Sequence, residues 1–313
     1  MESALVNTLN PGDKVLSVVA GKFGERWAKM AETFGAEVHT LNLEWGKPIQ
    51  LSQFEAHLKS QPDIKAVLTQ ACETSTATVF PIKEMALLTK QHTQALFMVD
   101  AITAMGCMDL KMDEWGLDVI VAGSQKAFML PTGLSFIGLS KRAQEASKKN
   151  QCKRYYFDWG PELKVHPKST HFSSPNSLVI ALAEVLKMFD EVGMAQVKSR
   201  CKVLAQATRE GAKDLGLHVF SEAPSDSVTA IQLPQNVDGE KIRSWIETKK
   251  NITVMGGQDQ LKGQILRVGH MGAIYDDDLL AFFDALMEAL NLPEPIDFKN
   301  RLSKILFGSM EYF

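Results

Sequence analysis

The sequence lacks the marks of several protein classes. Its 313 residues include only four cysteines, widely spaced and without a C-x-x-C pair, so neither a disulfide framework nor a thiolate zinc site is expected. No apolar run approaches the roughly 18 residues that a membrane-spanning helix needs, and the first residues do not form a signal peptide. With a net charge of −3, the chain has no basic excess for binding nucleic acid. These absences favour a cytoplasmic enzyme or soluble subunit without a membrane or nucleic-acid partner.

Nucleotide-binding and metal-binding motifs are also missing. No G-x-G-x-x-G sequence follows a predicted strand, and there is no Walker A sequence. The seven histidines form no H-x-x-x-H pair and no mixed cluster with cysteine. We therefore expect no metal site and find no local support for nucleotide binding.

What the sequence does contain is an alternation of short apolar runs with helical segments. The predicted strands are 15–19, 37–41, 66–69, 95–99 and 119–122, and the predicted helices between them include 25–34, 51–60 and 82–92. Strands separated by helices of about ten residues form βαβ units and hence a mostly parallel sheet. The runs are nearly continuously apolar, which is typical of strands covered on both faces. The fold class is therefore α/β.

The second part of the chain follows a different order. A long helix begins near Pro175, with Ser173, Ser174 or Asn176 as the expected cap. Beyond it, strands are predicted at 228–233, 252–255 and 265–268, and helices at 238–248 and 277–290. We place a boundary near residues 193–200. It separates a large domain of residues 1–195 from a smaller C-terminal α+β domain of residues 196–313.

Two strand ends carry the strongest chemical signal. Asp100 closes one predicted strand, and Lys126 follows the next strand, 26 residues further along the chain. In an open parallel sheet, ligands bind outside the carboxyl ends of the strands. Taken singly, Asp100 could cap the next segment and Lys126 could point into water. Together they suit pyridoxal phosphate, which needs a lysine for a Schiff base and an acid for its pyridine nitrogen.

The segments around these residues resemble the class V aminotransferases. The matching stretches are 99–106, 122–127 and 131–133, and the resemblance covers essentially the whole chain. It is nearest to the alanine–glyoxylate and serine–pyruvate (or serine–glyoxylate) enzymes. The resemblance implies a fold type I transferase that binds pyridoxal 5'-phosphate and forms a homodimer with active sites at the subunit interface.

The resemblance also implies roles for single residues around the cofactor. Lys126 matches the Schiff-base lysine and Asp100 the partner of the pyridine nitrogen. Ile102 would pack on one face of the cofactor ring and Phe23 would stack on the other, although Phe23 taken alone is nearly as well explained as a core aromatic. Ser75 matches a serine that contacts the ring hydroxyl. This last stretch departs from the family pattern, because Ala77 stands where a glycine is expected.

Four further residues match positions that bind phosphate or substrate. Gln125 resembles a phosphate ligand, and Thr170 and Ser173 resemble residues that reach the phosphate in the neighbouring subunit. Ser173 could cap the long helix at the same time. Arg267 matches the arginine that binds the substrate carboxylate. An arginine within an apolar strand also needs an anionic partner, and its planar guanidinium suits a carboxylate.

The first residues of the chain resemble the family from inside a helix. In full-length members a Ser/Gly/Thr loop before this helix binds the cofactor phosphate, and an N-terminal segment contributes to the dimer and the substrate pocket. We therefore expect either an incomplete chain of a working enzyme or a shortened relative with little activity.

The preferred hypothesis is transamination between a small amino acid, alanine or serine, and a 2-oxo acid, glyoxylate or pyruvate. Two alternatives stay open at this point. One is a non-catalytic subunit of the same fold, and the other is a different class V reaction such as a lyase or another transamination.

Overall fold

A six-stranded, mostly parallel sheet forms the centre of the N-terminal part of the molecule. The computed structural model describes residues 1–307. In order across the sheet the strands are β2 (Glu37–Asn42), β1 (Lys14–Val19), β3 (Ala66–Gln70), β6 (Leu96–Asp100), β7 (Val119–Gly123) and β8 (Ser135–Leu139). Neighbouring strands are parallel except for β8, which runs antiparallel to β7. The α/β class expected from the sequence is confirmed.

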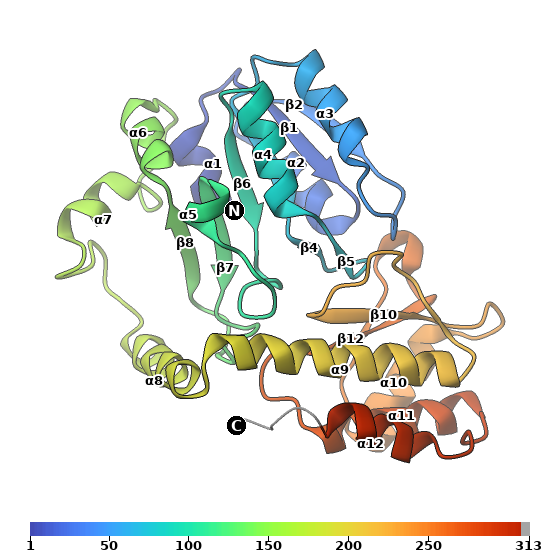
Figure 1. Cartoon of the computed structure of the whole chain (residues 1–313). Coiled ribbons are helices and arrows are strands. Elements are labelled where there is room, and N and C mark those ends of the chain that lie inside the picture. Colours follow the sequence, from blue (N-terminus) through green and yellow to red (C-terminus); the bar gives the residue numbers. More distant parts are fainter. Residues whose placement is uncertain (308–313) are drawn as a thin grey trace.

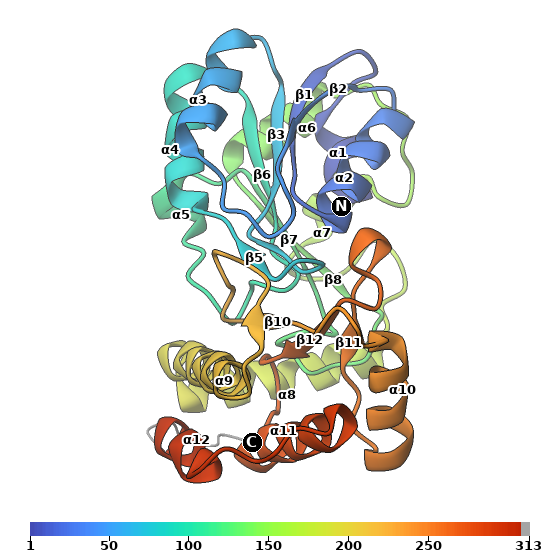
Figure 2. The ribbon, with the colours of Figure 1, turned by 90° about the vertical axis from the view of Figure 1, so that its right-hand side faces the viewer.

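Helices cover both faces of this sheet, which explains why its strands are apolar throughout. One face packs on α3 (Leu51–Ser60), α4 (Ile82–His92) and the short α5 (Met112–Trp115). The other face packs on α1 (Glu2–Thr8), α2 (Lys22–Thr33), α6 (Lys141–Lys149) and α7 (Trp159–Val165). Figure 2 shows α3 and α4 on one side of the strands and α1 and α2 on the other.

The C-terminal part contains a second, smaller sheet with its own core. Its strands are antiparallel, in the order β11 (Met255–Gly256), β12 (Ile265–Gly269), β10 (Val228–Gln232) and β9 (His218–Val219). Its helices are α9 (Met194–Asp214), α10 (Gly239–Lys250), α11 (Asp276–Leu290) and α12 (Phe298–Leu306). They cover the face of the sheet that points away from the N-terminal part (Figure 1).

The two parts are joined by backbone hydrogen bonds as well as by side chains. The strand β5 (Thr78–Val79) pairs with β4 (Cys72–Glu73) and reaches the C-terminal part, where the Val79 amide donates to the Ala223 carbonyl at 2.9 Å. The Ser225 amide returns a bond to the Ala77 carbonyl at 3.0 Å. These bonds fix the second sheet beside the carboxyl ends of the first.

Two expectations from the sequence are wrong in detail. The long helix α8 (Asn176–Val192) begins after Pro175, and no side chain caps it; the Ser174 hydroxyl instead lies 2.8 Å from that of Thr170. The strand expected at 252–255 is shortened to Met255–Gly256, because only these two residues pair with β12. Within residues 1–307, no helix combines the length and apolarity that crossing a membrane requires.

Candidate active site

The candidate site lies where β6 and β7 end. Asp100 is the last residue of β6, and Lys126 sits in the turn that follows β7. Ser124 holds this turn in place. Its hydroxyl donates to the Pro131 carbonyl at 2.7 Å and accepts from the Leu134 amide at 3.2 Å. These two hydrogen bonds fix the conformation of the segment that carries Lys126.

Burial changes the proton affinity of both groups. Asp100 is 6% exposed, and desolvation raises the pKa of its carboxyl to about 6, even though its Oδ1 accepts a hydrogen bond from the Ile102 amide. Desolvation also lowers the pKa of the half-buried Lys126 amine, and the positive charge of Arg267 lowers it further. The negative charge of Asp100 acts on Lys126 in the opposite direction. The Asp100 carboxyl and the Arg267 guanidinium therefore lie close enough to the Lys126 amine to affect its charge state.

Arg267 reaches this environment from the C-terminal sheet. It lies within β12 and is 8% exposed. Its Nε donates to the Gly256 carbonyl and its Nη1 to the Thr74 carbonyl, each at 3.0 Å. Within residues 1–307 no carboxylate comes within ion-pair distance of its guanidinium. Burial lowers its pKa, because two neutral carbonyls do not balance a buried positive charge. The arrangement suits an incoming carboxylate.

Phe23 is held in place by a buried acid, Glu73. The Glu73 carboxylate is fully buried and accepts the backbone N–H groups of Phe23, at 3.2 Å, and Gly24, at 2.9 Å, in the first turn of α2. It therefore binds the positive end of this helix. The Phe23 ring lies under the guanidinium of Arg26, whose Cζ is 5.0 Å from the ring centroid. Glu73 thus fixes the start of α2 and the position of Phe23.

The Ser75 hydroxyl also stabilises the first turn of α2. It donates to Glu73 Oε1 at 2.5 Å and accepts from the Lys22 amide at 3.0 Å, and the residue is fully buried. Any side chain on Gly21 would collide with the Ser75 Oγ. Ala77 takes a φ of +58°, a conformation that costs a non-glycine residue about 1–2 kcal/mol. This explains why glycine is the expected residue there.

Thr74 was not predicted as a site residue, but it contacts Arg267 directly, whereas the hydroxyl of its neighbour Ser75 bonds to Glu73 and Lys22. Thr74 is partly exposed; its hydroxyl is 2.8 Å from that of Thr103, and its carbonyl accepts from Arg267. Glu73 was missed as well. An acid before a Ser/Thr run was visible in the sequence, but its partners lie about 50 residues earlier, and no local pattern connects them.

Two other predicted residues flank the central pair. Ile102 follows Asp100 and donates its amide to it at 2.9 Å. Gln125 is exposed, and its side chain folds back beside Gly123. Both therefore sit on the two strand ends that carry Asp100 and Lys126.

Thr170 and Ser173 are not brought to this site. They line a separate pocket of about 660 Å³ with Ser3, Trp159 and His166. The Thr170 hydroxyl donates to the Phe172 carbonyl at 2.8 Å. Among the described residues, no hydrogen bond or ion pair joins Thr170 or Ser173 to the groups around Lys126.

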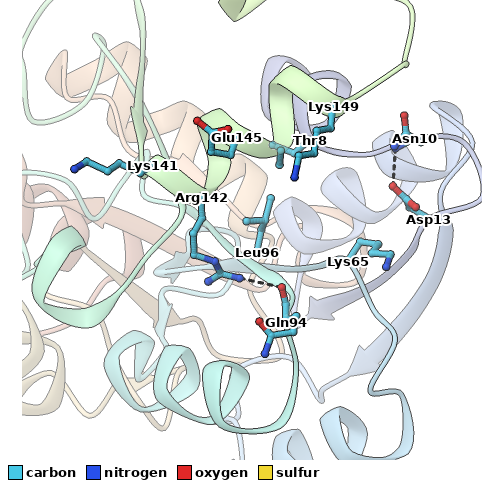
Figure 3. Close-up of a pocket in the computed structure, with 11 residues that line it drawn as sticks. Thr8, Asn10, Asp13, Lys65, Gln94, Leu96, Lys141, Arg142, Glu145 and Lys149 are labelled. Carbon is cyan, nitrogen blue, oxygen red and sulfur yellow. Dashed lines mark hydrogen bonds between the residues drawn. The ribbon is translucent and has the colours of Figure 1, made fainter.

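Another pocket lies at the opposite end of the parallel sheet (Figure 3). Leu96, the first residue of β6, and Lys65, which precedes β3, line its floor, and α6 supplies Arg142. The Arg142 Nη2 donates to the Gln94 carbonyl at 2.9 Å. This pocket of about 580 Å³ contains none of the predicted site residues. Asp100 and Lys126 lie instead at the carboxyl ends of β6 and β7, where open parallel sheets bind ligands.

Comparison with known proteins gives consistent matches over nearly the whole chain. The family model described as Aminotransferase class-V matches residues 2–271. The chain is 38% identical to "Soluble hydrogenase, small subunit" of Synechococcus sp. over 295 residues, which is 93% of this chain and 77% of that protein. It is 35% identical to the serine–glyoxylate aminotransferase of Methylorubrum extorquens over 292 residues, covering 89% and 72% of the two chains.

A solved structure supports the same relationship. The crystal structure of alanine–glyoxylate aminotransferase from Nostoc sp. superposes with a TM-score of 0.89 at 29% identity, and the match covers 93% of this chain and 78% of that one.

Proposed function

Because the chain belongs to the class V aminotransferases, we propose that it transfers an amino group between a small amino acid and a 2-oxo acid. The donor is alanine or serine, the acceptor is glyoxylate or pyruvate, and the cofactor is pyridoxal 5'-phosphate. The observation that carries this proposal is the pair of Asp100 and Lys126 at neighbouring strand ends, with Arg267 acting on the same amine. The fold is that of the fold type I transferases, as the sequence predicted.

The residues present fit such a cofactor. A buried carboxyl suits a protonated pyridine nitrogen, because a cation beside Asp100 would restore its ionised form. An amine whose pKa is lowered is more often free to react with an aldehyde. Phe23 and Ile102 would bound the two ring faces, Gln125 would contact the phosphate and Ser75 the ring hydroxyl. When bound, the cofactor would supply an electron sink for the substrate carbanion.

The chain's own side chains would divide the remaining work. Arg267 would bind the substrate carboxylate in bidentate fashion, since its guanidinium already has its orientation fixed by two carbonyls. The Lys126 amine would take the α-proton of the substrate as a general base and deliver it as a general acid to the carbon on the other side of the amino nitrogen. Asp100 would hold the proton on the pyridine nitrogen throughout.

A second copy of the chain would complete the site. Large apolar side chains are exposed near the loop that carries Thr170 and Ser173, including Tyr155 at 82% and Ile180 at 67%. Covering them in a homodimer would let Thr170 and Ser173 reach the cofactor of the partner. The free cysteines fit the reducing cytoplasm that we propose as its location.

Titration of the purified chain with pyridoxal phosphate tests the proposal. We expect a visible absorbance band that disappears on adding L-alanine or L-serine, with formation of the matching 2-oxo acid. Lys126→Ala should lose the band and at least about 10³-fold in rate, because the residue that moves the proton is gone. A wild-type chain that binds the cofactor without reacting with any amino acid would refute transamination.

A second candidate is a non-catalytic subunit of the same fold. It is favoured by the names of two relatives, which are described as soluble hydrogenase subunits. Equilibrium dialysis separates the two functions, because a purely structural subunit would not retain pyridoxal phosphate.

A further inference from the structure

Gln70 carries a buried side-chain amide without a hydrogen-bond partner. It is the last residue of β3 and is fully buried. Within residues 1–307, neither its Oε1 nor its Nε2 forms a hydrogen bond. The large majority of buried polar side-chain atoms in folded proteins are hydrogen-bonded, so an amide with both atoms unpaired requires a physical explanation.

The Gln70 side chain projects from the same face of the sheet as that of Asp100. The two residues are register partners at the ends of the parallel strands β3 and β6. The residues two and four positions before each of them pack together with α1 and α2; they are Ala66, Leu68, Leu96 and Met98. Because side chains alternate along a strand, Gln70 and Asp100 continue these two rows, one strand spacing of about 4.8 Å apart.

Both side chains also face the first turn of α2. A Cβ atom on Gly24 would lie 3.1 Å from Gln70 Oε1. The positive charge of Arg26, in the same part of the helix, acts on Asp100. The Gln70 amide therefore lies between the sheet and α2, on the side where the Asp100 carboxyl lies.

Two buried acids belong to this region, and only Asp100 has room for another donor. The Glu73 carboxylate already accepts four groups, two N–H groups from the first turn of α2 and the amide and hydroxyl of Ser75. An ionised carboxylate has about four acceptor positions, so those of Glu73 are filled. Among the described residues, the Asp100 carboxyl accepts one bond, from the Ile102 amide to its Oδ1. Its Oδ2 is the acceptor left for the Gln70 amide.

Charged groups surround Asp100 without forming a hydrogen bond to it. They are Glu73 on β4, Arg26 on α2, the terminal amine of Met1 and the Lys126 amine after β7. In the part of the chain that the structure describes, none of them forms an ion pair or hydrogen bond with the Asp100 carboxyl. Their charges therefore affect its ionisation, while the Ile102 amide alone fixes its orientation.

We propose that Gln70 is a positioning residue, whose amide N–H donates to Oδ2 of the ionised Asp100 and holds this carboxylate toward a cationic ring nitrogen. The terminal torsion of a glutamine side chain is broad, so the amide can turn toward Asp100 without straining the rest of the side chain. A hydrogen bond to a carboxylate is stronger than one between neutral groups. The role toward the ring nitrogen rests on the proposed function, whereas the bond between Gln70 and Asp100 does not.

NMR titration of Asp100 in the full, cofactor-free chain tests the bond without any reaction. Gln70→Met keeps an unbranched side chain of similar length but has no N–H group. We expect it to raise the pKa of Asp100 above about 6, with an acid dissociation constant about tenfold lower, because the ionised form loses a donor. Thr69→Val changes a buried polar side chain on the opposite face of β3 and is the matched control; it should leave the titration unchanged.

Stability at low pH separates this role from simple packing. Near pH 4.5 the Asp100 carboxyl is mostly protonated, so the wild-type amide has no charged acceptor. Gln70→Met then removes a buried unpaired group, and its urea midpoint should equal or exceed that of the wild type. A lower midpoint at this pH would show that the amide is bonded elsewhere and would overturn the inference. If Gln70→Met does not fold, Gln70→Leu removes the same amide.

The affinity for pyridoxamine phosphate tests the positioning role. This compound keeps the pyridine ring but has no aldehyde to react with Lys126. We expect Gln70→Met to bind it about tenfold more weakly, and to cause no further loss in an Asp100→Ala chain, because Gln70 acts through Asp100. Equal affinity of Gln70→Met and wild type, or equal losses with and without Asp100, would refute the positioning role.

The two measurements keep this inference separate from the proposed function. If the Asp100 titration shifts as expected but the wild-type chain neither binds pyridoxamine phosphate nor transaminates, the proposed function fails and the bond between Gln70 and Asp100 stands. If a folded Gln70→Met chain leaves the Asp100 titration unchanged, the inference is wrong, whatever reaction the chain carries out.

Discussion

At the scale of the residue, two charged neighbours act on the Lys126 amine in opposite directions, Arg267 lowering its pKa and Asp100 raising it. Burial and the positive charge of Arg267 lower the pKa of the Lys126 amine, while burial and the negative charge of Glu73 raise the pKa of the Asp100 carboxyl. The neutral amine is the form of Lys126 that reacts with an aldehyde, and a cationic ligand beside Asp100 would convert its neutral acid to the carboxylate. The sequence predicted the identities of Lys126, Asp100 and Arg267, but only the folded chain shows that Arg267 acts on Lys126.

Asp100→Asn should raise the free energy of unfolding of the cofactor-free chain near pH 8. Burial raises the pKa of Asp100 to about 6, so above that pH the folded state holds a buried carboxylate that the unfolded state keeps in water. Wild-type stability therefore falls as the pH rises from about 4 to about 6, by at most about 3 kcal/mol at 1.4 kcal/mol per pKa unit.

Urea unfolding of both chains at several pH values measures this difference. The advantage of the variant should shrink as the pH falls from about 6 to about 4 and be lost below that, where the wild-type carboxyl is protonated in both states. An advantage that is the same at every pH would contradict a cause in ionisation.

At the scale of the element, α2 shows what the sequence could and could not predict. The helices α3 and α4 were predicted with their observed ends, and the strands around them to within one or two residues. For α2 the predicted start was residue 25, but the helix begins at Lys22, because Glu73 and Ser75 cap it from a distant loop. The local sequence therefore predicts the helix, but it does not show that Glu73 accepts the N–H groups of its first turn.

The N-terminal end of α2 gives a second prediction. Glu73→Gln should lower the free energy of unfolding by on the order of 2–3 kcal/mol, because two helix N–H groups lose a charged acceptor in a fully buried place. The variant should also bind pyridoxal phosphate more weakly, since Phe23 would no longer be fixed. Cofactor affinity and urea unfolding measure the two effects, and Glu25→Gln, an exposed change in the same turn, is the control. Equal stability of Glu73→Gln and wild type would show that the carboxylate charge is not needed.

The division of the molecule into domains of residues 1–195 and 196–313 stays a prediction. The structure has a separate core for each sheet, and α9 begins at Met194, close to the predicted boundary. The sequence did not indicate α9 or α12 as helices. The apolar side of α9 packs on β10, and that of α12 packs on α9 and α11; such packing is a property of the folded chain rather than of either segment.

At the scale of the whole molecule, acid stability should depend on His270. This residue is 1% exposed; its Nδ1 lies 3.2 Å from the Asp226 carbonyl, and burial lowers its pKa to about 3. The folded chain therefore keeps the ring neutral, and stability is lost as the pH falls from about 6.5, where the unfolded histidine takes up a proton, toward 3.

His270→Asn keeps an N–H group for the Asp226 carbonyl but cannot titrate. It should be less stable than wild type at pH 7, because a buried ring is lost, yet its stability should fall less between pH 6.5 and 4. Urea unfolding at these pH values gives both slopes. Parallel slopes would exclude His270 as the group responsible.

The bond from Arg267 to the Thr74 carbonyl links recognition to the docking of the two sheets. The Arg267 guanidinium donates to Gly256 in its own sheet and to Thr74 in the N-terminal part. Its orientation is therefore fixed only while the two parts of the chain stay in contact. Any small acid captured by this arginine must then resist their separation, with a strength that grows with its concentration. Slower proteolysis at the contact between the N-terminal and C-terminal parts would thus show that a ligand occupies the site, even when no reaction takes place.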